Sequence, residues 1–233
     1  MCEASHTTNR IEAVGNIKYD LEPDETPLEW VETVRELAGN RPVVVLGSTM
    51  EGEEAALLAA LEELSRTGHH PFTILAPRHP ERFHQVAELL GRREVKHVRR
   101  SALSDGSRPA DVMLLDTIGE LARAYRLADV AFVGGSLVPT GGHNPLEPAV
   151  WGVPVLSGRH VFNFHEVYHE LVSAGGARLV EPGGELTAAL RDWLADPGAA
   201  RAAGEVGRRV VEANRGATAR TAEMLLRVLA GGG

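Results

Sequence analysis

Short apolar runs rich in β-branched residues alternate with segments of helical periodicity along most of the chain. Residues 41–47 form one such run, and residues 53–66 follow it with alanine and leucine at helical spacing. Strands buried on both faces have this pattern, because helices cover each side of a parallel sheet. The alternation therefore predicts an α/β fold, a doubly wound, Rossmann-like parallel sheet of about six core strands joined by right-handed crossovers.

The remaining elements follow from the same periodicities. The other strands are predicted at residues 72–76, 95–98, 112–115, 129–133, 153–156 and 177–180. Helices are predicted at residues 27–38, 80–90, 118–127, 145–151 and 164–174, with mostly helical sequence over 185–229. Residues 1–25 are polar and weakly patterned, so we expect a lead-in there and a single domain over residues 26–233.

The charge and cysteine content exclude several classes of protein. Lys and Arg total 24 against 32 Asp and Glu, a balance that argues against a nucleic-acid binder, whose binding face would be basic. Cys2 is the only cysteine, which leaves no intrachain disulfide and no cysteine-rich metal site. The ten histidines show no metal-ligand spacing such as His-Glu-x-x-His, so we predict no metal. No apolar run approaches the roughly 20 residues that span a bilayer.

Polar and glycine-rich segments follow several of the predicted strands. Ligands of open parallel sheets bind beyond the carboxyl ends of the strands, where the strand order reverses. Four segments qualify: residues 47–51, 76–79, 134–136 with the loop that follows, and 143–147. Their coincidence predicts a binding site at this edge of the sheet.

The segment Gly141-Gly-His-Asn-Pro-Leu-Glu-Pro148 is the best of these candidates. Pro145 suits the first turn of a helix, and Asn144 before it can cap that helix. A helix start preceded by glycines attracts phosphate, and the Glu147 carboxylate could accept both hydroxyls of a ribose. In the alternative interpretation, Asn144 and Glu147 only cap the helix and complement its dipole.

Three further side chains are candidates for ligand contacts. Arg78, at the end of a strand, can offer two parallel hydrogen bonds to a phosphate or carboxylate, or it forms a surface salt bridge. Ser48 and Thr49 either donate hydroxyls to a ligand or cap the next helix. The G-x-G-x-x-G, G-x-S-x-G and P-loop motifs are all missing, which disfavours hydride transfer, serine hydrolysis and ATP hydrolysis.

Taken together, the motifs resemble those of the Kdo (3-deoxy-D-manno-octulosonic acid) transferase family. The matching segments, in the order of the family, are Gly15-Asn-Ile-Lys-Tyr-Asp20, Gly47-Ser-Thr-Met-Glu-Gly-Glu-Glu54, Pro77-Arg-His-Pro-Glu-Arg-Phe83, Asp116-Thr-Ile-Gly-Glu-Leu121, Asp129-Val-Ala-Phe-Val-Gly-Gly-Ser136, Gly141-Gly-His-Asn-Pro-Leu-Glu-Pro148 and Asn163-Phe164. Met50 departs from the pattern, because a larger polar or aromatic residue is expected there.

The resemblance implies the C-terminal, donor-binding half of a GT-B glycosyltransferase that transfers Kdo from CMP-Kdo to a lipid A precursor with inversion. It also implies a metal-independent reaction at the cytoplasmic face of the bacterial inner membrane. The residues implied in donor binding are Ser48, Thr49, Arg78, Gly134, Gly135, Ser136, Asn144 and Glu147, with the glycine-rich loops giving N–H groups to the phosphate.

The family places its catalytic base, its membrane anchor and its lipid A site in an N-terminal domain that we do not find in this chain. We therefore predict no catalytic residue here and poor transfer by the chain alone, because aligning the two substrates is much of what such an enzyme contributes. Part of residues 205–229 is expected to face that domain. The alternatives are another GT-B enzyme, such as a UDP-sugar 2-epimerase, and a non-catalytic nucleotide-binding module.

Overall fold

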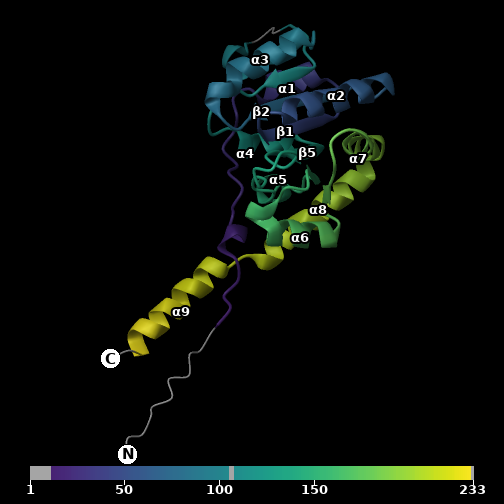
Figure 1. Ribbon diagram of the computed structural model, residues 1–233. Coiled ribbons are helices and arrows are strands. Elements are labelled where there is room, and N and C mark those ends of the chain that lie inside the picture. The colour runs from purple at the N-terminus through teal and green to yellow at the C-terminus, as the bar shows by residue number, and fades with distance from the viewer. Residues whose placement is uncertain (1–11, 105–107, 232–233) are drawn as a thin grey trace, which may run out of the picture.

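A single parallel sheet forms the centre of the molecule in the computed structural model, which describes residues 12–104 and 108–231 (Figure 1). Cys2 lies outside these ranges. Over the described residues the sheet has seven strands in the order β3-β4-β2-β1-β5-β6-β7. The strands are β1 (Val43–Thr49), β2 (Phe72–Pro77), β3 (His97–Arg99), β4 (Val112–Leu114), β5 (Val130–Val133), β6 (Val155–Ser157) and β7 (Ala177–Leu179). All pairings are parallel, which confirms the predicted sheet with one strand more than the expected core.

Helices cover both faces of the sheet, as predicted. The α-helices are α1 (Val31–Ala38), α2 (Glu53–Arg66), α3 (Phe83–Arg92), α4 (Leu121–Ala124), α5 (Leu146–Ala149), α6 (His165–Ala174), α7 (Gly184–Ala195), α8 (Pro197–Asn214) and α9 (Ala217–Gly231). Short 3-10 turns are η1 (Ile17–Tyr19), η2 (Pro80–Arg82), η3 (Arg100–Ala102), η4 (Tyr125–Leu127) and η5 (Phe162–Phe164). Val44 and Leu46 of β1 pack in a core with α2, α3 and α7, whereas Val45 packs on the other face with α1 and α4.

The mostly helical sequence predicted near the C-terminus forms three helices, α7, α8 and α9. Pro197 starts α8, and the Asp196 side chain caps it by accepting a 2.9 Å hydrogen bond from the Ala199 N–H. Gly216, with φ of 90°, separates α8 from α9. Gly204 lets α8 approach the domain closely, because a Cβ there would lie 1.9 Å from the Gly152 carbonyl oxygen.

The described part of the predicted lead-in is held against the C-terminal helices. The Tyr19 hydroxyl donates to Glu170 of α6 over 2.7 Å, and Lys18 Nζ donates to the Asn163 carbonyl over 3.0 Å. The Asp20 carboxylate accepts from the Thr218 N–H over 2.6 Å and also from the Gly216 N–H. The segment therefore joins the α8–α9 junction to the loop before α6.

Asp20 makes this junction sensitive to acid. Hydrogen bonds from Thr218 and from the backbone at Gly216 lower the pKa of Asp20 from its usual 3.8 to about 2. A carboxylate with a depressed pKa contributes stability that is present above its unfolded pKa and is lost as the pH falls through the folded pKa. We expect the Gly216 and Thr218 amides to lose hydrogen-exchange protection between about pH 4 and pH 2. Asp20→Asn should remove that pH dependence, and a normal Asp20 titration midpoint by NMR would contradict it.

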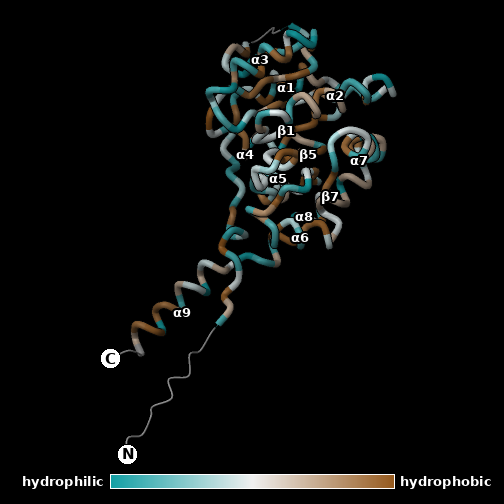
Figure 2. Tube along the Cα trace, in the orientation of Figure 1, coloured by the Kyte–Doolittle hydropathy of each residue, from teal (hydrophilic) through white to brown (hydrophobic). Residues whose placement is uncertain are grey.

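Helix α9 leaves apolar side chains in solvent. It projects from the domain, and its hydrophobic stretch lies toward the free end (Figures 1 and 2). Leu226 is 67% exposed and Leu229 77% exposed. Helix α8, by contrast, packs against α5, α6 and α7. The exposed surface expected within residues 205–229 thus lies in its α9 part. None of the described helices is long and apolar enough to cross a bilayer.

Candidate functional site

The four predicted loop segments meet at the carboxyl edge of the sheet. Strand β1 lies between β2 and β5, so the strand order reverses beside it. Backbone hydrogen bonds connect the segments: Arg78 N–H to the Thr49 carbonyl (2.9 Å), Gly134 N–H to the Gly47 carbonyl (2.8 Å) and His143 N–H to the Gly134 carbonyl (3.1 Å). The structure thus brings together four segments that are spread over about a hundred positions of the sequence.

Glu147, in the first turn of α5, is a half-buried residue whose carboxylate belongs to this edge. Burial raises its pKa, and the positive charge of Arg78 opposes that shift. No hydrogen bond from a residue in the described part of the chain reaches the carboxylate. An acceptor held in the protein without a donor is typical of a group that binds a ligand, because buried polar groups are normally paired.

Arg78, after β2, is exposed and forms no ion pair within the described ranges. The structure therefore does not show the surface salt bridge that was its alternative role. Arg78 is close enough to Glu147 and to His143 to affect the pKa of both. A guanidinium without an ion-pair partner can form two parallel charged hydrogen bonds with an anion.

His143 belongs to the same group of side chains. Its Nε2 atom is buried and has no hydrogen-bond partner among the described residues. Burial lowers the pKa of His143, and the charges of Arg78 and His79 lower it further. The ring is therefore neutral at pH 7. It lies against Gly135 and near Arg78, so we add His143 to the candidate site, although the motif spacing alone did not identify it.

Ser48 and Thr49 occupy an irregular end of β1. The strand register shifts between Gly47 and Thr49, and Ser48 has a φ of 54°, uncommon for a residue with a side chain. Thr49 is fully buried, and its hydroxyl donates to Glu54 over 2.8 Å. Neither side chain caps α2, whose N-cap is Gly52. Thr49 thus orders the buried Glu54 carboxylate, which also pairs with Arg82 at 2.7 Å.

The Gly134–Ser136 loop is bound by a carboxylate of the chain itself. Glu53, at the start of α2, is fully buried and accepts from the N–H groups of Gly135 (2.7 Å), Ser136 (2.8 Å) and Leu137 (2.8 Å). It also accepts from the Met50 N–H over 2.8 Å. The expectation that the N–H groups of Gly135 and Ser136 are free for a phosphate is therefore wrong.

The Ser136 hydroxyl is also already hydrogen-bonded within the chain. Its side chain is fully buried, donates to the Val133 carbonyl and accepts from the Gly158 N–H. Gly134 is required by packing, because a Cβ there would lie 2.5 Å from the Ser48 carbonyl oxygen and 2.8 Å from Glu53 Oε2. Contact of Gly134, Gly135 and Ser136 with a ligand stays a prediction. The structure gives Gly134 and Ser136 a packing role.

Asn144 does bind the start of α5, although the helix is shorter than predicted. Its Oδ1 accepts from the Leu146 N–H over 3.1 Å, and the helix covers only Leu146–Ala149, with Pro145 at the N-cap position. So short a helix has a weak dipole, so the side chains around it matter more for binding an anion than the helix start does.

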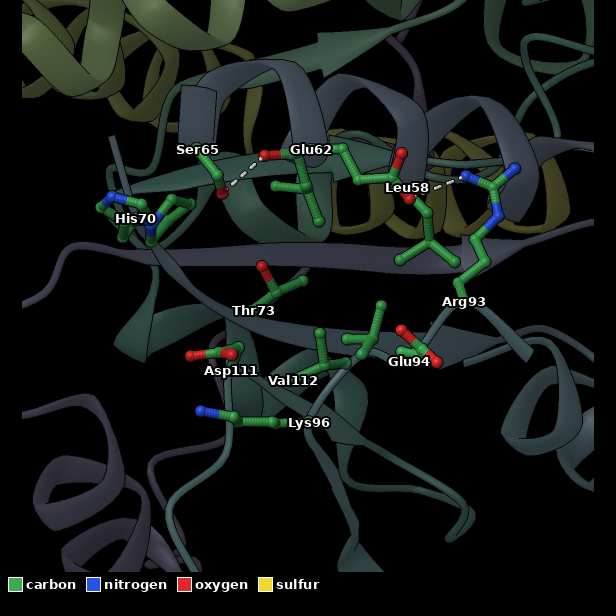
Figure 3. Close-up of a pocket in the computed structure, with 13 residues that line it drawn as sticks. Leu58, Glu62, Ser65, His70, Thr73, Arg93, Glu94, Lys96, Asp111 and Val112 are labelled. Carbon is green, nitrogen blue, oxygen red and sulfur yellow. Dashed lines mark hydrogen bonds and ion pairs between the residues drawn. The ribbon is translucent and has the colours of Figure 1, made fainter. Parts of the chain in front are cut away.

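A cavity in the described part of the chain lies at the opposite, amino edge of the sheet (Figure 3). It lies between α2 and the strands β2–β4. Two of its charged side chains already have partners, since Arg93 pairs with Glu62 at 3.0 Å and Asp111 with Arg41 at 2.7 Å. The carboxyl edge, where Glu147 and Arg78 are unpaired, is the better candidate. No group of three or more His, Cys, Asp or Glu within the described ranges could hold a metal ion.

Comparison with known proteins identifies the family. No protein-family model matches the chain. It is 37% identical to the 3-deoxy-D-manno-octulosonic acid transferase of Haemophilus influenzae over 93% of its own length and 51% of that protein. The transferase of Bordetella pertussis is also 37% identical, over 97% of the chain and 53% of that protein. The crystal structure of the C-terminal CMP-Kdo binding domain of WaaA from Acinetobacter baumannii is 32% identical with a TM-score of 0.71, and the match covers 78% of this chain and 97% of that domain.

The chain belongs to the Kdo transferase family. This confirms the family predicted from the motifs, and the domain match confirms a Rossmann-like C-terminal half of GT-B type. The chain spans about half the length of the transferases it matches. Sucrose-phosphate synthase from Thermosynechococcus elongatus (21% identical, TM-score 0.60) and UDP-GlcNAc 2-epimerase from Neisseria meningitidis (17%, TM-score 0.53) share the fold.

Proposed function

We propose that this chain is the donor-binding domain of a Kdo transferase and binds CMP-Kdo at the carboxyl edge of its sheet. The observation that carries the proposal is the pair of unpaired, oppositely charged side chains there, Glu147 and Arg78, on a chain whose relative is a CMP-Kdo binding domain. Glu147 would accept hydrogen bonds from the ribose hydroxyls. Arg78 would bind the phosphate or the Kdo carboxylate.

The site supports donor activation by electrostatics. When the bond from Kdo to the phosphate breaks, negative charge develops on the leaving CMP. A fixed guanidinium stabilises that charge, and a partly buried site strengthens the interaction relative to water. We propose that no metal ion takes part, with Arg78 supplying the positive charge and Asn144 shaping the adjoining turn through its bond to Leu146.

We propose that the acceptor binds to a part of the enzyme other than this domain. We propose a lipid A precursor as the acceptor, inversion at the transferred sugar, and activation of the acceptor by a base from the portion of the relatives' length that this chain does not span. We propose for the whole enzyme the cytoplasmic face of the bacterial inner membrane.

Selective binding of CMP tests the proposal. Calorimetric titration should show that CMP binds, that UMP and UDP-GlcNAc bind much more weakly, and that Glu147→Ala removes CMP binding. Glu88→Ala, on the exposed surface of α3, is the matched control and should bind CMP as the original chain does. Preference for the uridine ligands would indicate another GT-B activity, and no binding of any nucleotide would overturn the proposal.

A further inference from the structure

Tyr125 is an almost fully buried residue whose hydroxyl has no hydrogen-bond partner in the described part of the chain. The residue opens η4 and is 1% exposed, yet its hydroxyl makes no hydrogen bond to any residue that the structure describes. The chain's other two tyrosines differ, since Tyr19 donates to Glu170 and Tyr168 is paired with Ser157 at 2.8 Å. Buried tyrosine hydroxyls usually find a partner, so the free one at Tyr125 calls for an explanation.

The hydroxyl lies against the carboxyl end of the central strand. It rests against Gly47, where a Cβ would come within 1.9 Å of the hydroxyl oxygen. Gly47 is at the carboxyl end of the central strand and is paired with Ala76 and Val133 on either side. Any side chain at position 47 would displace the Tyr125 ring. The close contact between Gly47 and the Tyr125 hydroxyl therefore requires glycine at this position, which lies where the strand order reverses.

Glu147 is the electrostatic neighbour of this phenol. Burial raises the pKa of Tyr125 well above its usual range, and the Glu147 charge raises it further, so the hydroxyl stays protonated and can donate. The two groups are not hydrogen-bonded to each other. A donor and an acceptor, both without a hydrogen-bond partner in the described ranges, thus lie near one another at the carboxyl edge of the sheet.

We propose that the Tyr125 hydroxyl donates a hydrogen bond to a ribose or phosphate oxygen of the nucleotide whose hydroxyls Glu147 accepts. Tyr125 is then a ligand-binding residue of the donor site, in addition to those that the sequence motifs suggest. This inference rests on the proposed function, because it takes a cytidine mononucleotide as the ligand.

Tyr125→Phe tests the inference without changing the packing. We expect CMP affinity to fall about 5- to 20-fold, as for the loss of one hydrogen bond, while the melting temperature is unchanged or rises. Tyr19→Phe is the control, because it removes a bonded hydroxyl away from the site. It should lower the melting temperature and leave CMP affinity unchanged.

A spectroscopic measurement distinguishes contact from an indirect effect. With only three tyrosines in the chain, tyrosine labelled with ¹³C at Cζ gives three NMR signals that phenylalanine variants assign. CMP should move the Tyr125 signal and leave that of Tyr19 in place. If the original chain binds CMP but Tyr125→Phe binds it equally well, the inference is wrong and the proposed function stands. If the original chain does not bind CMP, both are wrong.

Discussion

Glu53→Ala is expected to destabilise the chain by about 3 to 5 kcal/mol, a large part of the stability of an ordinary domain. The reason is the number of donors that lose their acceptor at once. Four backbone N–H groups, those of Met50, Gly135, Ser136 and Leu137, bond to this one fully buried carboxylate. An unpaired buried donor costs about 1 to 3 kcal/mol, and water entering the space left by the side chain recovers part of that cost.

Denaturant unfolding of matched variants measures this effect. Glu51→Ala removes an exposed glutamate two positions earlier and should change the unfolding free energy by no more than about 0.5 kcal/mol. Glu53→Gln keeps the shape of the side chain but loses the charge that all four donors share, and an intermediate loss is expected. A loss below about 1 kcal/mol for Glu53→Ala would show that the loop does not depend on this carboxylate.

Arg78→Ala is expected to lower CMP affinity about 10- to 100-fold with little change in stability. The guanidinium is exposed and has no ion pair in the described part of the chain, so its removal leaves no buried group unpaired. A charged hydrogen bond to phosphate is worth more than a neutral one, which sets the size of the effect. The affinity of the original chain should also fall as salt is added, because the contact is between opposite charges.

The matched control is an exposed arginine far from the carboxyl edge. Arg191 on α7 is also exposed, and Arg191→Ala should leave both CMP affinity and its salt dependence unchanged. Equal affinity of the Arg78→Ala variant and the original chain would remove Arg78 from the site. It would also contradict the proposal that Arg78 stabilises the negative charge on the departing CMP.

Periodicity alone located most of the fold. The run at residues 72–76 became β2 and the amphipathic segment at residues 53–66 became α2, because both are dictated by neighbours close in sequence. The rule that ligands bind at carboxyl strand ends then brought Arg78 and Glu147 to one edge. Local patterns were less informative at residues 185–229, where Pro197 and Gly216 divide one predicted helical stretch into three helices.

The contacts that the sequence did not reveal are long-range. Glu53 looks in sequence like an ordinary first-turn glutamate that complements a helix dipole, yet three of its four partners lie more than eighty positions away. Tyr125 likewise looks like one more apolar position of a helix, and only its contact with Gly47 places its hydroxyl at the carboxyl end of β1. Side chains whose role depends on a distant loop carry no periodic signal, so the tertiary structure is needed to find them.

The lead-in segment is linked to the loop before α5 through Asn163. Lys18 donates to the Asn163 carbonyl, and the Asn163 side chain in turn donates to the Thr140 carbonyl over 3.1 Å and contacts Gly142. The lead-in segment is therefore connected, through Asn163, to the loop that leads into His143 and Asn144.

The location of bound CMP is the most direct test of the central claim, that the carboxyl edge of the sheet is the nucleotide site. Amide chemical shifts of the ¹⁵N-labelled chain would be followed by NMR during a CMP titration. We expect the largest changes at residues 47–51, 77–79 and 134–147, and none around Arg93 and Asp111 at the amino-edge cavity. Changes gathered at that cavity, or none anywhere at saturating CMP, would contradict the claim.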